Sequence, residues 1–408
     1  MRRRPATMPN VRTSTPQFGS QSALREANSQ RIVEAIRRHG ALTQVEIAAT
    51  TGLSQATVST IVKLLLNQGV VDTRSTVRTG RRAQLVTLAQ RTGLAVGIHI
   101  GQRSLRVLIG DSGHDGLSER VLPLPPDHRV DTTLDRAALL VVDLVESLGA
   151  ELSEIVGAGV ALPAAIDPRT GMIRARGVLD GWEDTDIREV LARRLGIPII
   201  VETDAAAGTL GESRFGAGRG CSDIVFVRAS HLVGAGLVVG GQLHRGRRGI
   251  AGEIGHVEVD PAGAICPCGS RGCLNTVVGA DALTNLLRMS RSGITLRDLI
   301  RFAVEGDPGC RQVISDAGAA IGAVVAGLAL AFDPQRIIVG GELAETGELL
   351  LAPLRDAVTR RVPLTGDDGV EVVPGELGQQ AEVRGLVALA FDQRRSMATV
   401  QGRGEHVS

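Results

Sequence analysis

The pattern of apolar residues changes once along this chain, near residue 93, and the change divides its 408 residues into two parts. Residues 23–92 carry three short helical patterns followed by two strand-like stretches. From Leu94 onward, short apolar runs alternate with amphipathic helices, which is typical of an α/β fold. The length allows two or three domains, each able to bury its own core. A basic segment at 1–22 and the segment 396–408 lack such patterns and are predicted to be disordered tails.

The distribution of charged side chains also changes near residue 93. Residues 1–92 hold 14 basic and 4 acidic side chains, a net charge of +10, whereas the remainder has a net charge of −9. Such asymmetry indicates nucleic-acid contact by the basic part, although a solvated basic face without a partner would have the same composition. With six Phe, one Trp and no Tyr, a module that stacks bases on several aromatic rings is disfavoured.

Three helices are predicted in the basic part. The first covers 29–39, and the second begins at a capping box formed by Thr43 and Glu46 and ends at Gly52. Ser54 caps the third helix, which has an apolar stripe and a polar face. Two helices joined by a short turn, the second small and polar at its start, indicate a helix-turn-helix. The predicted DNA contacts on this helix are Ser54, Gln55, Thr57, Ser59, Thr60 and Lys63.

Residues 70–89 form two strand-like stretches around a basic, Gly-containing turn. This arrangement predicts a wing, so we expect residues 23–92 to form a winged helix-turn-helix domain. Arginines at a wing tip can enter a minor groove or hold phosphates, and here they are Arg78, Arg81 and Arg82. A three-helix protein-interaction module with an incidental basic hairpin is the alternative. The charge, the polar helix face and the arginine-rich tip together favour binding to double-stranded DNA.

Three of the five cysteines lie within eight positions, in a Gly-turned stretch that reads CPCGSRGC. Together with His256, the residues Cys266, Cys268 and Cys273 supply one imidazole and three thiolates, a set suited to tetrahedral Zn2+. Reduced core cysteines are the alternative, but a polar, Gly-rich turn is a poor place for core residues. We therefore expect a closed, structural zinc site.

The second part reads as an α/β body. A strand pair at 94–113 is followed by a helix and a buried strand, and a second Gly-turned hairpin lies at 223–241. This recurrence predicts two related lobes with a cleft between them. The small lobe would comprise residues 93–203, completed by a C-terminal helix at 380–395, and the large lobe would comprise residues 204–379.

The longest apolar run, residues 317–332, is shorter than the roughly 20 residues that a membrane span requires. A helix buried in a globular domain is the better interpretation. The basic N-terminus lacks the apolar stretch of a signal peptide. The sequence therefore predicts a cytoplasmic protein without a membrane partner.

The order of these features resembles the ROK family, whose name covers repressors, open reading frames and sugar kinases. The resemblance runs from about residue 25 to about residue 395 and rests on the winged helix and on the stretches GIHIG, ETDAAAGTLGE, GIAGEIGH, CPCGSRGC and RIIVGGEL. It implies an actin-like, ribonuclease-H-like fold of two lobes. It also implies the zinc site and an inter-lobe site that binds a sugar, with adjacent ATP in the kinase members.

Both phosphate-binding loops of the kinase members are altered here. The first reads D-x-G-G-T in those kinases and HIGQR at residues 99–103 of this chain. The second, G-T-G-x-G-x-G, here begins with SHL at residues 230–232, which removes a close backbone approach and a hydroxyl. Because phosphoryl transfer depends on this cradle, we expect no enzymatic activity. Asp204, at the place of the family's catalytic base, would then be a relic that binds a ligand or caps a helix.

The resemblance assigns ligand contacts to Thr203, Asp204, Glu253, His256 and Asn275. Thr203 replaces an Asn of the family and Asn275 replaces a Glu, while Val178 and Ala164 replace an Asn and a Gly. Because sugar pockets depend on matched, buried hydrogen bonds, these changes should alter or abolish the sugar preference. A modified sugar is one candidate effector, and a ligand-free dimerisation body is the alternative.

The sequence therefore predicts a DNA-binding transcriptional regulator, most consistent with a repressor, that acts as a homodimer or homotetramer on paired half-sites of an operator. A carbohydrate-type ligand between the lobes would favour one closure angle and so set operator affinity. Two alternatives stay open. One is an active ATP-dependent sugar kinase with an appended DNA-binding domain, and the other is a regulator controlled by a protein partner without a sugar ligand.

Overall fold

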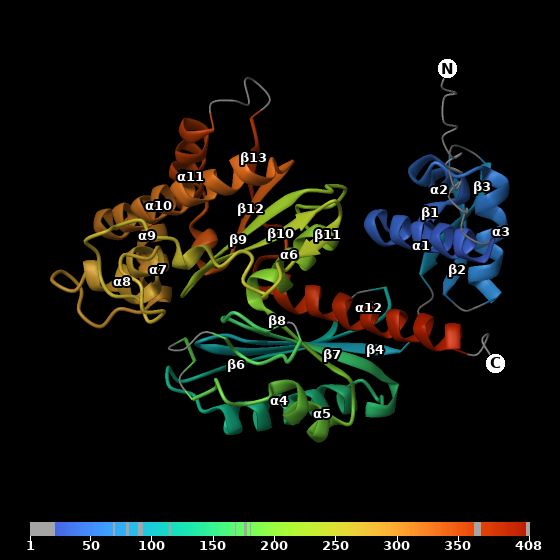
Figure 1. Cartoon of the computed structure of the whole chain (residues 1–408), viewed down its shortest axis with the longest axis horizontal. Helices are drawn as coiled ribbons and strands as arrows, with labels where there is room; N and C mark the ends of the chain where they lie inside the picture. Colours follow the sequence, from blue (N-terminus) through green and yellow to red (C-terminus); the bar gives the residue numbers. More distant parts are fainter. Residues whose placement is uncertain are drawn as a thin grey trace, which may run out of the picture. The chain divides into compact units, whose positions relative to one another are not determined.

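The computed structural model of the chain describes residues 21–67, 70–78, 81–88, 93–113, 116–167, 169–174, 178–179, 181–362 and 369–404. The chain divides into two compact units, Met1–Leu88 and Ala89–Ser408 (Figure 1). Among the described residues, the first unit has one β-sheet and the second has two, and each sheet contributes to a hydrophobic core of its own.

The N-terminal unit packs three helices on a three-stranded sheet of order β1-β3-β2. The predicted capping box is formed, because the Thr43 side chain accepts from the Glu46 backbone N–H and the Glu46 carboxylate accepts from the Thr43 N–H. Strands β2 and β3 form the predicted hairpin, so the unit is a winged helix. Its elements are α1 (Gln21–His39), β1 (Leu42–Thr43), α2 (Gln44–Thr51), α3 (Gln55–Asn67), β2 (Val71–Arg78) and β3 (Arg81–Leu88).

Helix α1 is longer than the sequence pattern indicates. It begins at Gln21 rather than at residue 29, and so reaches into the segment predicted to be a tail. The additional turns, QSALREAN, are mostly polar and lack the apolar periodicity on which the prediction depended. Residues 1–20 lie outside the described part of the chain.

The small lobe of the second unit is a five-stranded sheet of order β6-β5-β4-β7-β8. Strand β4 pairs antiparallel with β5 and parallel with β7, and its residues are almost all buried. Helices α4 and α5 cover one face of the sheet, and α12 covers the other (Figure 1). The elements are β4 (Leu94–Ile100), β5 (Ser104–Gly110), β6 (Gly116–Pro123), α4 (Val130–Ser147), η1 (Leu152–Glu154), β7 (Ile155–Leu162), α5 (Ile187–Leu195) and β8 (Ile199–Thr203).

The large lobe is a second five-stranded sheet, of order β11-β10-β9-β12-β13. Strands β9 and β10 form the predicted antiparallel hairpin, and β12 joins β9 in parallel. The elements are α6 (Asp204–Phe215), β9 (Ile224–Ala229), β10 (Val233–Val239), β11 (Gln242–His244), η2 (Ile254–His256), α7 (Asn275–Val278), α8 (Ala280–Leu286), α9 (Leu296–Glu305), α10 (Pro308–Phe332), β12 (Arg336–Gly340), η3 (Glu342–Thr346), α11 (Glu348–Arg361), β13 (Glu371–Pro374) and η5 (Gly378–Gln380).

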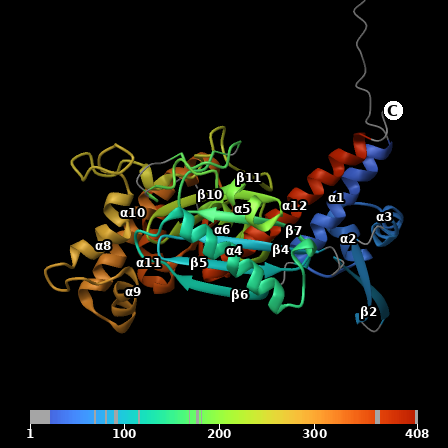
Figure 2. The same ribbon diagram turned by 90° about the horizontal axis from the view of Figure 1, so that it is seen from below.

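Helix α10 contains the apolar run noted in the sequence. Among the described residues it is the one helix long and apolar enough to cross a membrane. Its buried side belongs to the large-lobe core, and a Cβ at Gly318 or Gly322 would meet the backbone of α11. Figure 2 shows α8, α9 and α10 gathered at the outer end of the large lobe. The helix is therefore a packed element of this lobe, as predicted.

Helices α6 and α12 (Ala381–Gly404) lie between the two sheets and pack against each other (Figure 1). Their close crossing requires glycine, because a Cβ at Gly211 would overlap the carbonyl oxygen of Ala381 and one at Gly385 would overlap that of Ala207. Helix α12 ends at Gly404, beyond the predicted end at 395, and 405–408 lie outside the described part. The crossing brings the beginning of each helix to a pocket between the lobes.

Candidate functional site

The predicted recognition helix, α3, is amphipathic. Val58, Ile61 and Val62 are buried in the core of the winged helix, whereas Gln55 and Lys63 are exposed. Ser54, Gln55, Thr60 and Lys63 are all exposed, and Thr57 and Ser59 are half-buried. None of these six residues belongs to the hydrophobic core of the unit.

The hydroxyl groups at the start of α3 are held locally. The Thr57 N–H donates to the Ser54 hydroxyl at 3.2 Å, and the two hydroxyls are 2.8 Å apart. The Thr60 hydroxyl donates to the Ala56 carbonyl. Ser54 is thus the cap that the sequence predicted, and it carries an oriented hydroxyl at a helix N-terminus, where an anion is favoured.

The predicted wing tip lies between β2 and β3. The backbone of Arg78 pairs with that of Arg81, which fixes the register of the hairpin. Residues 79–80 and the side chains of Arg78, Arg81 and Arg82 lie outside the described part of the chain.

The four predicted metal ligands come together around η2 and the loop that follows it. The ligand atoms of His256, Cys266, Cys268 and Cys273 all lie within 4.8 Å of one another. The Cys268 and Cys273 sulfurs are 3.7 Å apart, and the Cys266 sulfur is 3.5 Å from Nδ1 of His256. A tetrahedral ion with Zn–S bonds of about 2.3 Å would hold two sulfurs roughly 3.8 Å apart. The donor set therefore fits a tetrahedral cation.

The electrostatics of this cluster agree with its geometry. Burial and hydrogen bonds to the neighbouring thiols raise the pKa of Cys273 to about 12. Three thiols so close together cannot all ionise without a cation, and a bound metal ion would supply one. Cys221 and Cys310 lie outside the cluster.

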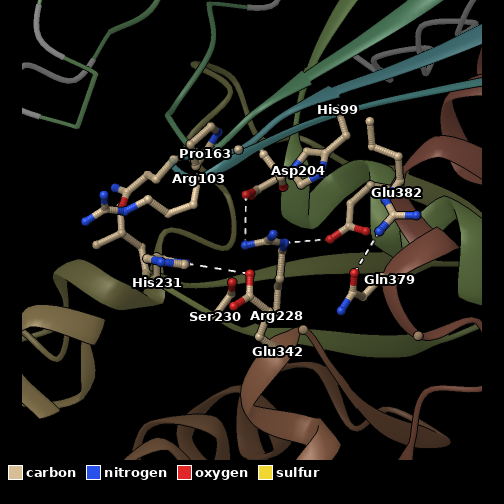
Figure 3. Close-up of a pocket in the computed structure, with 17 residues that line it drawn as sticks. His99, Arg103, Pro163, Asp204, Arg228, Ser230, His231, Glu342, Gln379 and Glu382 are labelled. Carbon is tan, nitrogen blue, oxygen red and sulfur yellow. Dashed lines mark hydrogen bonds and ion pairs between the residues drawn. The ribbon is translucent and has the colours of Figure 1, made fainter. Parts of the chain in front are cut away.

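A pocket lies between the two lobes (Figure 3). Residues from both altered phosphate loops line it, including His99 and Arg103 from the first and Ser230 and His231 from the second. Asp204 also faces the pocket. The structure thus brings together the two loops and the relic base position that are far apart in the sequence.

A buried arginine, Arg228, occupies the centre of this group. Its Nη1 is 3.1 Å from Oδ2 of Asp204, and its Nε donates to Oε1 of Glu382 at 2.6 Å. Burial would lower the pKa of Arg228, but the charges of Asp204 and Glu382 outweigh burial and raise it. The guanidinium is therefore a permanent positive charge between two buried carboxylates.

Burial and this positive charge shift the pKa values of the neighbouring titratable groups. Burial raises the pKa of Asp204 to about 6, although Arg228 opposes the rise. Burial also opposes ionisation of Glu382, but Arg228 and His99 outweigh it and lower the pKa of this carboxyl. Burial lowers the pKa of His99 to about 4, so the imidazole is neutral at pH 7. Two carboxylates and one guanidinium are thus charged around a neutral histidine at neutral pH.

Asp204 is not the cap of α6, contrary to one of the two roles expected for it. The N-cap is Thr203, whose hydroxyl accepts from the Ala206 N–H at 3.1 Å. Asp204 is the first helical residue, and its carboxylate turns toward Arg228 instead. Thr203 therefore caps α6, while Asp204 faces the pocket.

The other predicted ligand residues lie outside the lining of this pocket. Burial, and next the negative charge of Asp204, raise the pKa of Glu253 to about 7. Oε2 of Glu253 is 4.0 Å from Nε2 of His256, so the His256 ring faces the cysteines with Nδ1 and Glu253 with Nε2. Asn275 accepts a hydrogen bond from the Val233 N–H and holds the beginning of β10.

Sequence reasoning missed Arg228 and Glu382. Arg228 ends the apolar run IVFVR, and a charge inside a wholly buried strand was the available signal. Glu382 gave no comparable signal, because an acidic residue in the first turn of a helix is common. Gly341, which follows β12 and lines the pocket, has a packing reason to be glycine, because a Cβ there would overlap the carbonyl oxygen of Ala229.

Comparison with protein families matches residues 95–393 to the ROK family and residues 30–82 to the MarR family. Among curated relatives, the DNA-binding transcriptional dual regulator NagC of Escherichia coli is 29% identical, over 90% of this chain and 93% of its own. The xylose repressor of Bacillus subtilis is 24% identical, over 94% of this chain and all of its own.

Solved structures share the fold. A ROK family transcriptional regulator, described as a homolog of the E. coli MLC protein, superposes with a TM-score of 0.72 at 22% identity, over 90% of this chain and 96% of its own. A ROK family glucokinase from Streptomyces griseus, in complex with glucose and AMPPNP, superposes with a TM-score of 0.65 at 28% identity. That match covers 74% of this chain and all of the glucokinase. Both lobes of the second unit thus have counterparts in a regulator and in a kinase.

Proposed function

This chain belongs to the ROK family, and within it we propose that the protein is a DNA-binding transcriptional repressor whose kinase-like body senses a carbohydrate-type ligand. The observation that carries the proposal is a winged helix joined to a body in which the relic base, Asp204, is ion-paired to an arginine. The names of relatives that align over nine-tenths of the chain or more support it.

The DNA contacts proposed for operator binding lie on α3 and on the wing. Gln55, Ser59 and Lys63 would face the major groove, where Gln can pair with a base edge and Lys with phosphate. The paired hydroxyls of Ser54 and Thr57 at the helix N-terminus suit a phosphate oxygen, and Thr60 extends the same surface. Arg78, Arg81 and Arg82 would contact the backbone or a minor groove.

The body is proposed to lack kinase activity. A catalytic base must be free to accept a proton from a substrate hydroxyl, whereas Asp204 is held 3.1 Å from a guanidinium. The first loop presents the bulky Gln102 and Arg103 and the second presents Ser230 and His231, where a phosphate cradle needs small residues. Phosphorylation of a hexose in a coupled ATP assay would instead identify the protein as an active sugar kinase.

The cluster of His256, Cys266, Cys268 and Cys273 is proposed to hold a structural Zn2+. When bound, the ion would neutralise the thiolates and hold the loop in place. Because Nδ1 of His256 faces the cysteines, its Nε2 stays directed toward Glu253. The loop that carries the three cysteines would thereby help to hold Glu253 and His256 in place for the proposed ligand.

A sugar or sugar derivative is proposed to bind beside Asp204, Glu253 and His256, with Thr203 and Asn275 at its margin. Ligand binding would favour one arrangement of the lobes, 93–203 with α12 and 204–379, and so change the spacing of two DNA-binding units. We expect a homodimer or homotetramer in the cytoplasm, without a membrane partner, because paired half-sites require two copies.

The proposal is tested with the full-length chain and a random pool of double-stranded DNA. Repeated selection should enrich one sequence family, and its affinity should fall when Lys63 is replaced by Ala. Equal retention of all sequences would contradict specific operator recognition. A pull-down from lysate without added sugar tests the alternative, in which a protein partner and not a sugar controls the regulator.

A further inference from the structure

A charged residue occupies a fully buried strand in the large lobe. All six residues of β9 are buried, and the exposed fraction of Arg228 is 9%. Because side chains alternate along a strand, Arg228 shares a face with Ile224 and Phe226. A Cβ at Gly208 of α6 would meet the Phe226 ring, so this face of β9 is directed toward α6. Arg228 therefore projects into the layer that separates the two sheets.

The guanidinium links the two helices of that layer. Nη1 contacts Asp204 at the start of α6, and Nε contacts Glu382 at the start of α12 (Figure 3). Within the described part of the chain, Oδ2 of Asp204 makes the ion pair with Arg228 but no well-aligned hydrogen bond, and Nε2 of His99 is buried without a hydrogen-bond partner. Both residues line the same pocket. The pocket therefore holds polar atoms that a ligand or water could satisfy.

We propose that Arg228 is a positioning residue: bound to both Asp204 and Glu382, it supplies the built-in positive charge that keeps the Asp204 carboxylate ionised and oriented toward a ligand. The inference deepens the proposed function and, in its ligand part, rests on it.

Charge balance in the pocket supports this role. The acidic groups near Asp204 and Arg228 are Glu382 on α12, Glu342 on η3 and Glu253 before η2. His99 on β4 is neutral at pH 7, His231 lies beside Glu342, and Arg103 is at the exposed margin. Arg106 on β5 also lines the pocket but is paired with Glu119, so Arg228 is the buried cation that contacts Asp204 and Glu382. Without it, buried Asp204 would take up a proton, because an unpaired charge is costly in a low dielectric.

A purely structural role makes a different prediction from a positioning role. If Arg228 served only to fill space between helices, its loss would lower stability by a similar amount at every pH. If it keeps Asp204 ionised, the loss must grow as the pH rises, because the unpaired carboxylate is then forced to ionise in the folded body.

The direct test is urea unfolding of the full chain from pH 5.5 to 8.5, followed by the fluorescence of the single, buried Trp182. Arg228→Met should lose stability progressively above pH 6, and a second change, Asp204→Asn, should remove the part of that dependence that Asp204 contributes, the remainder belonging to Glu382. Arg228→Lys should restore the wild-type profile in part. The control Arg336→Met removes a partly exposed ion pair with Glu371 and should leave the profile unchanged. A constant difference between Arg228→Met and wild type across this range would overturn the proposal.

Ligand binding gives a second readout, with N-acetylglucosamine, xylose and glucose as probes. At pH 7 a sugar that binds the wild type should bind Arg228→Met at least ~10-fold more weakly, and the pH midpoint of binding should move upward. An unchanged affinity and midpoint would overturn the positioning role. If none of these sugars binds the wild type, the proposed ligand class fails, whereas the unfolding profiles still decide the role of Arg228.

Discussion

Replacing Gly385 by Ala should loosen the crossing of α6 and α12, which brings Asp204 and Glu382 to the pocket. The added Cβ would overlap the carbonyl oxygen of Ala207, a backbone atom that cannot rotate away. Overpacking of this kind costs about 1–3 kcal/mol, and a backbone contact belongs at the upper end of that range. Alanine in a helix interior recovers about 1 kcal/mol relative to glycine. We therefore expect a net loss of about 2 kcal/mol in the free energy of unfolding.

Gly327 on α10 provides the matched control. It lies in a helix interior, it is exposed, and a Cβ there would meet no atom within 4 Å. Gly327→Ala should therefore stabilise the body by about 0.5–1 kcal/mol. Urea titrations followed by Trp182 fluorescence and by circular dichroism measure both variants. If Gly385→Ala proves as stable as wild type or Gly327→Ala, the crossing of α6 and α12 does not require glycine at position 385.

The remaining predictions concern the three sites. Cys268→Ser should lower bound zinc, measured by atomic emission, and reduce the stability of the body; full metal content in this variant would refute the site. Lys63→Ala should weaken DNA binding and lower the slope of log affinity against log salt by about 1 if it contacts one phosphate, measured by fluorescence anisotropy. The folded-state pKa of Asp204, about 6, lies above its ordinary value of 3.8. Its contribution to stability is therefore present at low pH and is lost as the pH rises from about 4 to about 6, by about 3 kcal/mol in all. Asp204→Asn should remove this loss, and an identical pH profile for the two proteins would show that Asp204 is not buried and charged as described.

Local features were predictable from the sequence. The capping box at Thr43, the cap at Ser54 and the β9–β10 hairpin each depend on residues within a few positions of one another. The gathering of His256 with the three cysteines was also predictable, because donor type and short spacing restrict the loop.

The pocket's ion pairs could not be read from the sequence in the same way. Arg228 meets Glu382 across 154 positions, and the meeting depends on how closely α6 and α12 cross. Asp204 follows a strand and opens a helix, a place where capping and ligand binding produce the same sequence pattern. Only the position of Thr203, which takes the cap, separates the two roles. The polar first turns of α1 and the extension of α12 to Gly404 were missed because they lack a regular apolar stripe.

The central claim is that a carbohydrate-type ligand changes the DNA affinity of this chain. The most direct measurement is fluorescence anisotropy of the full-length protein on its selected DNA sequence, with and without N-acetylglucosamine, xylose or glucose. At least one sugar should shift the dissociation constant by about 5- to 150-fold, the range of typical coupling free energies, and Asp204→Asn should abolish the shift while leaving the sugar-free affinity unchanged. A sugar that binds the body but leaves the DNA affinity unaltered would contradict the claim.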